Sequence, residues 1–191
     1  MSEEKTVDRR TVKTKNTIRN ALAELLKEKK LNRITVQEIV DKADVSRVTF
    51  YKYYLDVYDL YEQIEKELLV SMGLIVLELA EGTTEDFFRK LIGYIYENRI
   101  TFGMVFSPNG TNQLRDKLCR LIEGTFRKIC SERSGVSINE KEIFYICCYR
   151  SNGLISIIEK WAQGGFQEPC EDIIRPLVML DKLIDGQFNN K

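Results

Sequence analysis

Apolar side chains recur at helical spacing along almost the whole chain, and no stretch keeps the alternation of apolar and polar residues that a half-buried strand requires. The first such segment covers residues 11–29, where Ile18, Leu22, Leu25 and Leu26 fall on one face of a helix. Only three of the 191 residues are prolines, which interrupt helices. The pattern therefore predicts an all-α protein.

Two short helices are predicted next, joined by a tight turn. Thr35 and Glu38 have the spacing of a capping box, and the apolar positions after them predict a helix that ends near Ala43. Ser46 is a suitable N-cap for another helix, which should end at about Tyr54. Two short helices across a three-residue turn are typical of a helix-turn-helix.

Longer helices are predicted in the rest of the chain. Asp56 can cap a helix that runs to about Glu81, and Gly82 ends it. Ser137 and Glu140 have the spacing of a second capping box. Further helices are expected at 84–106, 111–133, 139–163 and 169–185. We therefore expect a three-helix N-terminal domain, residues 1–62, and a larger helical domain, residues 63–191.

Charge is distributed unevenly between these two parts. The chain as a whole has 29 basic and 29 acidic residues, so its total charge indicates no partner. Residues 1–55 hold thirteen Lys and Arg against eight Asp and Glu, which leaves sixteen against twenty-one for the remainder. The predicted helix-turn-helix thus lies in the basic part of the chain.

The composition lacks the residues and motifs on which most enzymes depend. Histidine, the most frequent general base and metal ligand, is absent, and none of the phosphate-binding glycine motifs occurs. The five cysteines form no CxxC pair, and we expect them to pack as small apolar side chains, with a redox sensor as the alternative. We therefore expect no catalytic residue, no metal and no cofactor.

No membrane segment is expected either. The most apolar stretch, residues 68–80, is shorter than the roughly 20 residues that span a bilayer and contains Ser71, Gly73 and Glu78. The first fifteen residues are polar, unlike a secretory signal. These features predict a cytoplasmic protein.

The second helix of the predicted motif has one apolar face and one polar face. Phe50 and Tyr54, at i and i+4, can be buried behind it. The opposite face is then available to phosphates and base edges, and Thr35 adds a hydroxyl at the start of the preceding helix. The alternative is a surface helix whose polar face is only hydrated. The candidate DNA-binding residues are Thr35, Arg47, Val48, Thr49, Tyr51, Lys52 and Tyr53.

Residues 14–60, above all the run ITVQEIVDKADVSRVTFYKYY, resemble the DNA-binding domain of the TetR family of transcriptional regulators. The resemblance implies that residues 46–54 form the recognition helix of a ligand-responsive repressor, which binds a palindromic operator in double-stranded DNA as a homodimer. It places Arg47, Val48 and Tyr51 nearest the bases. Thr35, Thr49, Lys52 and Tyr53 are implied to lie nearer the phosphates.

Two positions differ from the usual family pattern. Asp44 stands where a glycine commonly completes the turn, although Asp tolerates the left-handed conformation better than most residues. Val57 stands where the family often has a phosphate-binding lysine, and Asp56 and Asp59 flank it. The alternative function is therefore a coactivator or partner-dependent regulator whose own DNA binding is weak.

The resemblance also implies that the last two helices pair with their copies in the dimer, although the same residues could instead complete the core of one chain. The candidate interface residues are Ile155, Ile158, Trp161, Leu177, Leu180 and Ile184. Aromatic side chains in the middle helices are either core or the lining of a pocket for an apolar or aromatic effector. The candidate pocket residues are Phe102, Phe106, Phe126, Tyr145 and Tyr149.

Overall fold

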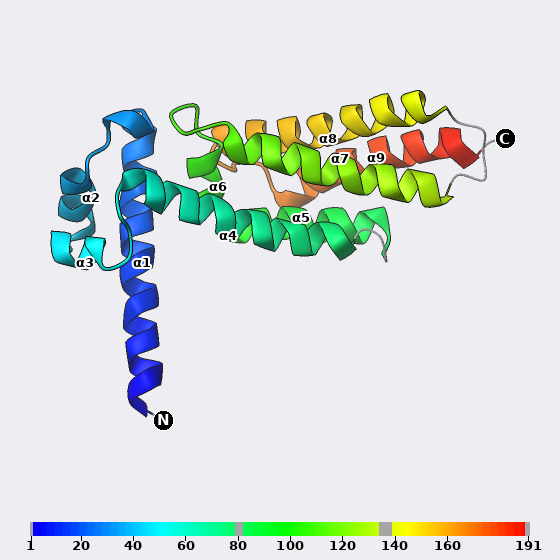
Figure 1. Cartoon of the computed structure of the whole chain (residues 1–191). Coiled ribbons are helices and arrows are strands. Elements are labelled where there is room, and N and C mark those ends of the chain that lie inside the picture. The colour runs from blue at the N-terminus through cyan, green and yellow to red at the C-terminus, as the bar shows by residue number, and fades with distance from the viewer. Residues whose placement is uncertain (1, 79–81, 134–138, 190–191) are drawn as a thin grey trace. The chain divides into compact units, whose positions relative to one another are not determined.

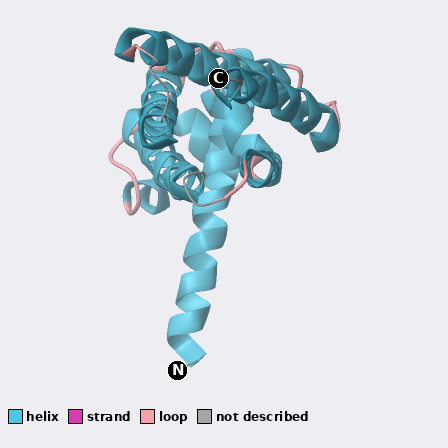
Figure 2. Cartoon of the chain, turned by 90° about the vertical axis from the view of Figure 1, so that its right-hand side faces the viewer, coloured by secondary structure: helices cyan, strands magenta, loops and turns pink. Residues whose placement is uncertain are grey.

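The computed structural model describes residues 2–78, 82–133 and 139–189, and every regular element in these ranges is a helix (Figures 1 and 2). The predicted all-α fold is confirmed. The first helices are α1 (Ser2–Glu28), the 3-10 turn η1 (Leu31–Arg33), α2 (Val36–Ala43), α3 (Arg47–Tyr51) and α4 (Val57–Glu78). They are followed by α5 (Thr84–Glu97), α6 (Arg99–Val105), α7 (Gln113–Arg133), α8 (Glu140–Gln163) and α9 (Cys170–Asn189).

Two predicted boundaries were wrong, and a third helix start agrees with the prediction but has a different cap. Helix α1 begins at Ser2, well before residue 11. The segment predicted as one helix over 84–106 is two, because the Asn98 side chain donates a 2.8 Å hydrogen bond to the Tyr94 carbonyl and ends α5 there. Helix α8 is capped by Asn139, whose side chain accepts from the Lys141 N–H, while the predicted cap Ser137 lies outside the described residues.

The chain forms two compact units, and α4 contributes to both. The N-terminal unit comprises Met1–Lys66 and Ile100–Thr111, and the C-terminal unit comprises Glu67–Arg99 and Asn112–Lys191. The core of the N-terminal unit contains Ile18, Leu22, Leu26, Ile39, Phe50 and Leu60, each at most 1% exposed. Burial of a side chain of this kind stabilises a fold by about 1.5–3 kcal/mol, so these residues hold α1 to α4 together.

A turn from later in the chain closes the end of α1. The Ser107 hydroxyl and the Asn109 side-chain amide both donate to the Leu26 carbonyl, at 3.3 and 2.9 Å. The Leu31 N–H in turn donates to the Asn109 carbonyl at 2.9 Å. The last turn of a helix has carbonyls without helical partners, and this turn supplies donors to one of them.

The same turn is bonded to α4. The Thr111 N–H donates to the Tyr61 hydroxyl at 3.2 Å, and the Thr111 hydroxyl donates to the Glu65 carboxylate at 2.9 Å. Both acceptors are buried, and burial raises the pKa of Tyr61. Residues 107–111 therefore belong structurally with α1 and α4, although they follow α5 and α6 in the sequence.

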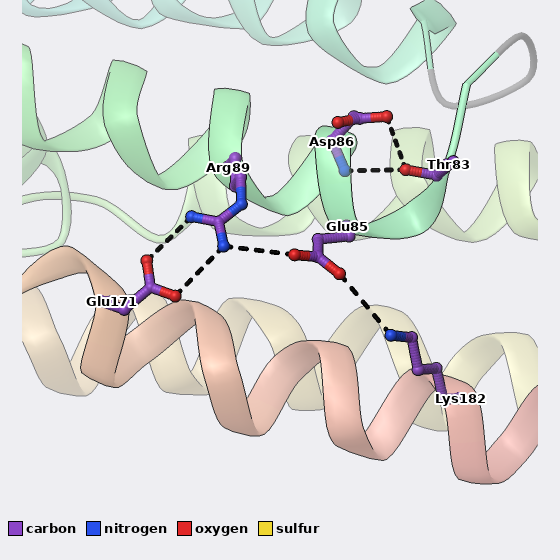
Figure 3. Close-up of polar contacts among 6 residues, drawn as sticks. All are labelled: Thr83, Glu85, Asp86, Arg89, Glu171 and Lys182. Atoms are coloured by element: carbon purple, nitrogen blue, oxygen red, sulfur yellow. Dashed lines mark hydrogen bonds and ion pairs between the residues drawn. The ribbon is translucent and has the colours of Figure 1, made fainter.

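In the C-terminal unit, α7 packs along α8 and α5 along α9. Figure 3 shows the polar contacts between α5 and α9: Arg89 binds Glu171 through two nitrogens, at 2.8 and 3.2 Å, and Lys182 lies 3.6 Å from Glu85. These charges are partly exposed and are screened by salt. A buried ion pair between Arg150 and Asp181 joins α8 to α9, and the Arg150 guanidinium lies 4.3 Å from the centre of the Phe126 ring.

The start of α2 is held by a carboxylate with a strongly perturbed pKa. The Thr35 hydroxyl accepts from the Glu38 N–H, and the Glu38 carboxylate accepts from the Thr35 N–H at 3.0 Å, which confirms the predicted capping box. The Lys29 ammonium also pairs with this carboxylate. The hydrogen bond from Lys29, followed by those from Thr35, lowers the pKa of Glu38 from 4.5 to about 2.

Gly110→Ala should destabilise the protein, because a Cβ at this position would lie 2.5 Å from the Tyr61 hydroxyl oxygen. We expect a loss of about 1–3 kcal/mol in the free energy of unfolding, measured by urea denaturation. In a Tyr61→Phe background the obstructing oxygen is gone, so the same substitution should cost less. Equal costs in both backgrounds would contradict the contact.

Glu38→Gln should destabilise the protein in a pH-dependent way. A carboxyl whose pKa is lowered by folding stabilises the native state above its unfolded pKa and loses that effect as the pH falls through the folded value. The difference between Glu38→Gln and wild type should therefore be full above about pH 5 and shrink between 4.5 and 2. Lys29→Gln should weaken this pH dependence, and a difference that stays constant from pH 7 to pH 3 would refute the explanation.

Candidate nucleic-acid interface

The turn between α2 and α3 is built by Asp44. Its backbone is left-handed, with φ 52° and ψ 49°, and it follows the last residue of α2, Ala43. The Val45 N–H then donates to the Val40 carbonyl at 3.1 Å, and the Ser46 hydroxyl accepts from the Thr49 N–H at 3.1 Å. The predicted turn forms with Asp in the place usual for glycine, and Ser46 caps α3 as expected.

Helix α3 is anchored on one side only. Phe50 and Tyr54 are 0% and 1% exposed, and their rings lie 5.6 Å apart, as the i, i+4 pattern predicted. The opposite side points to solvent, with Val48 82% and Tyr51 54% exposed. Arg47 and Lys52 are also exposed, and Thr49 and Tyr53 are partly buried. The structure thus gathers the candidate residues of α3 on and around one open helix face.

Arg47 is positioned by a residue of the preceding helix that the sequence analysis did not identify. Its Nε donates to the Gln37 side-chain oxygen at 2.6 Å, and the Gln37 amide nitrogen donates to Asp41 on the same helix. Among the described side chains this is the only polar contact of the guanidinium, so its terminal nitrogens remain available. The i, i+4 spacing of Gln37 and Asp41 was visible in the sequence, but the contact across the turn was not.

Tyr53 lies close to two lysines. The ammonium groups of Lys15, from α1, and of Lys52, at the end of α3, are each 5.7 Å from the centre of its ring. Aromatic rings attract cations at such distances. The ring therefore brings a cation of α1 next to the candidate recognition helix, and Lys15 joins the site as a second residue that sequence reasoning missed.

The N-terminal ends of α2 and α4 have fewer groups available to bind a phosphate than the family pattern suggested. The Thr35 hydroxyl already donates to the Glu38 carboxylate at 3.0 Å. Val57 is buried, and the carboxylates of Asp56 and Asp59 accept from backbone N–H groups at the start of α4, each at 2.8 Å. These two aspartates cap the helix, so no cation occupies the place of the usual phosphate contact.

The five candidate pocket residues do not form one group. Phe102 and Phe106 stack on each other in the N-terminal unit, with ring centres 6.2 Å apart. Phe126 is buried in the C-terminal unit beside Arg150, whereas Tyr145 and Tyr149 are 59% and 68% exposed on α8. A hollow of about 550 Å³ does lie between α7 and α8, lined by Gly124, Arg127, Lys128, Glu140, Ile143 and Phe144. None of the five predicted residues lines it.

The six candidate interface residues divide into two groups. Leu180 and Ile184 keep exposed surface on α9. The others are buried within the single chain: Ile155, Ile158, Trp161 and Leu177. The Trp161 indole, for example, donates to the Glu168 carbonyl at 3.0 Å and stacks on Tyr96. In the single chain these four side chains therefore pack in the core.

The described part of the chain contains neither a candidate membrane span nor a candidate metal site. No described helix is long and apolar enough to cross a membrane. The described Cys, Asp and Glu residues nowhere form a group of three or more that could hold a metal ion. The helix-turn-helix thus remains the main candidate site.

Comparison with known proteins agrees with this geometry. The TetR_C_8 family, described as "Transcriptional regulator C-terminal region", matches residues 82–184. A 56-residue stretch is 36% identical to the uncharacterized HTH-type transcriptional regulator YxbF of Bacillus subtilis (strain 168). That match spans 29% of this chain but only 15% of the length of YxbF.

Solved structures share the fold over nearly the whole chain. A TetR transcriptional regulator from Streptococcus agalactiae 2603V has a TM-score of 0.60 and 20% identity over 93% of this chain and 98% of its own. The dihydroxyacetone kinase operon activator DhaS has a TM-score of 0.60 and 18% identity over 92% and 96%. The fatty acid degradation regulator FadR from Bacillus halodurans has a TM-score of 0.63 and 15% identity over 87% and 93%.

The helix-turn-helix geometry points to a regulator of transcription, and regulators of the matched family are not enzymes. The solved structures show that the fold is shared. The family match over residues 82–184 is decisive, because it covers more than half of the chain. This chain belongs to the TetR family of transcriptional regulators.

Proposed function

We propose that this chain binds an operator in double-stranded DNA as a homodimer, with α3 of each copy in the major groove. The observation that carries the proposal is the open face of α3, where Arg47, Val48 and Tyr51 project while Phe50 and Tyr54 hold the helix from behind. An arginine can donate two hydrogen bonds to a guanine, and an exposed valine can contact a thymine methyl group. These three residues would read bases.

The remaining candidates would bind the DNA backbone. Lys52 and Lys15 flank the Tyr53 ring, and Thr49 lies on α3. Ammonium groups bind phosphates through charge and therefore contribute equally to every sequence. Thr35 would contribute mainly through the N–H groups at the start of α2, because its hydroxyl is engaged with Glu38.

Dimerisation would use the exposed apolar faces of α8 and α9. Tyr145 and Tyr149 on α8 are joined there by Met179, Leu180 and Leu183 on α9, which are 56%, 41% and 61% exposed. The buried Arg150–Asp181 pair ties the two helices together next to Tyr149 and Leu180 in the sequence. Exposed apolar patches of this kind mark protein interfaces, and a two-fold dimer can place two recognition helices on the half-sites of a palindrome.

We further propose that a small apolar or aromatic effector controls the affinity for DNA. A ligand can release the operator only if it binds the conformation that does not bind DNA more tightly. A coupling of about 1–3 kcal/mol would change operator affinity about 5-fold to 150-fold. Compounds that raise the melting temperature should therefore be titrated against the operator complex, and unchanged affinity with all of them would refute effector control.

A partner-dependent activator is the second candidate function. It is favoured by the start of α4, where the buried Val57 stands in place of the usual phosphate-binding lysine and two aspartates flank it. DhaS, which shares the fold, is a dihydroxyacetone kinase operon activator, so this fold can serve activation. Mobility shift with DNA from upstream of the chain's own gene separates the two functions, because a partner-dependent protein should bind only when its partner is added.

Arg47→Ala and Tyr51→Ala should each weaken binding to the operator more than binding to random DNA. Loss of a two-point base contact costs about 1–3 kcal/mol, which corresponds to roughly 5-fold to 150-fold in affinity. Lys52→Ala should weaken binding to both and reduce the slope of log affinity against log salt by about 0.9. Fluorescence anisotropy measures the affinity of all three variants, with Arg175→Ala in the C-terminal unit as control. Unchanged affinity in all three would contradict the assignment of these residues to DNA binding.

Leu180→Glu combined with Leu183→Glu should convert the dimer to a monomer, because two charges would be buried in the proposed interface. Sedimentation at micromolar concentration reports the mass. Leu74→Glu is the matched control, since Leu74 is 62% exposed on α4, outside that interface. A double variant that sediments as a dimer with wild-type operator affinity would contradict the interface.

A further inference from the structure

Helix α1 carries an unusual cationic stretch. Five cations and no carboxylate occur between Arg9 and Ala23, and the first acidic residue after them is Glu24. The stretch lies on regular helix, and Ile18 is its first buried residue. Figure 1 shows α1 continuing past α2 and α3 of the same unit as a single straight helix. The cations are thus held on a rigid support beside the helix-turn-helix.

On several other exposed helix faces a cation pairs with an acid one turn away, as in Lys27–Glu24 at 2.6 Å and Lys66–Glu62 at 3.0 Å. Among the side chains that the structure describes, Arg9, Arg10 and Lys13 form no ion pair. Arg9 and Lys13 stand at i and i+4, where like charges destabilise a helix. A helix face that only contacts water gains nothing from this repulsion between cations. A bound polyanion would neutralise the two charges and remove the repulsion.

The exposed face of this stretch has donors throughout. Arg9, Lys13, Asn16 and Asn20 follow one another at i, i+4, i+7 and i+11 and therefore share a side of the helix. With Val12 and Thr17 they line a shallow hollow of about 400 Å³. Guanidinium, ammonium and amide groups are the donors that bind phosphate oxygens in protein–DNA interfaces.

Lys15 connects this stretch to the recognition helix, because it shares the Tyr53 ring with Lys52. At the same time, the start of α4 lacks the cation that the family pattern places there. The backbone contact missing from α4 can thus be replaced from α1, on a helix that is already in contact with the end of α3.

We propose that residues 9–20 of α1 form a second DNA-binding surface, which grips backbone phosphates outside the base pairs read by α3. The inference rests on the proposed function and extends it. Eleven helical steps span about 17 Å, the axial length of roughly five base pairs. The surface recognises phosphates, so it adds affinity for all duplex DNA and lengthens the contacted segment without adding sequence specificity.

The double variant Arg9→Gln/Lys13→Gln tests the proposal, because glutamine keeps the helix propensity and removes only the charge. Binding to the upstream DNA and to a random duplex is measured by anisotropy over a range of salt concentrations. The slope of log affinity against log salt should fall by about 2, and affinity near 0.1 M salt should fall roughly 10-fold to 100-fold on both duplexes. The matched control, Lys160→Gln/Arg175→Gln, removes two exposed cations from the C-terminal unit and should change neither quantity.

Hydroxyl-radical footprinting locates the contact. In the double variant, protection should disappear from the outermost phosphates and persist at those around α3. An unchanged slope and footprint, with wild-type binding that still depends on Arg47, would overturn this inference alone. A wild-type protein that binds neither duplex at low salt would overturn both the proposed function and the α1 surface. Equal losses of affinity in the control variant would show a general effect of charge, which would overturn the α1 surface.

Discussion

The burial of Phe50 and Tyr54 is the interaction on which the DNA-binding face depends. Helices α2 and α3 have eight and five residues, far below the roughly 12–15 that an isolated helix needs in water. They exist because these two aromatic rings, with Ile39, are packed into a core that α1 and α4 complete. The same packing fixes which side of α3 faces outward, so Arg47, Val48 and Tyr51 are exposed as a consequence of what is buried behind them.

The N-terminal unit is completed by residues that lie far away in the sequence. The turn at 107–111 bonds to the end of α1 through Leu26 and Leu31, and to α4 through Tyr61 and Glu65. These residues connect directly to α7 of the other unit along the chain. A change in the position of α6 would therefore act on α1 and α4 through these hydrogen bonds as well as through the covalent chain, and the proposed effector would reach the recognition helix by this route.

Charged side chains are arranged differently in the C-terminal unit and on α1. In the C-terminal unit several described cations pair with acids, as in the Arg89–Glu171 and Arg115–Glu159 pairs, and the exposed face of α9 is apolar at Met179 and Leu183. Such a surface suits a partner of the same kind. On α1, by contrast, Arg9, Arg10 and Lys13 form no ion pair among the described side chains, which suits a polyanion.

The sequence by itself determined the helical class, the capping box at Thr35, the left-handed turn at Asp44 and the two-sided character of α3. Each of these depends on residues within one or two helical turns of one another, where spacing alone decides which side chains can meet. It also located the cationic start of α1, because charge is read directly from residue types.

Only the tertiary structure decided which apolar residues are core and which are surface on the last helices. Trp161 and Leu177 are buried while Leu180 and Tyr149 are exposed, although all four have the same pattern along the chain. Likewise Phe102 and Phe106 pack with the N-terminal unit, and the contacts of Gln37 with Arg47 and of Lys15 with Tyr53 cross from one helix to another. A helix with apolar residues on several sides does not specify which side meets which neighbour, because that choice is made by the packing of all helices together.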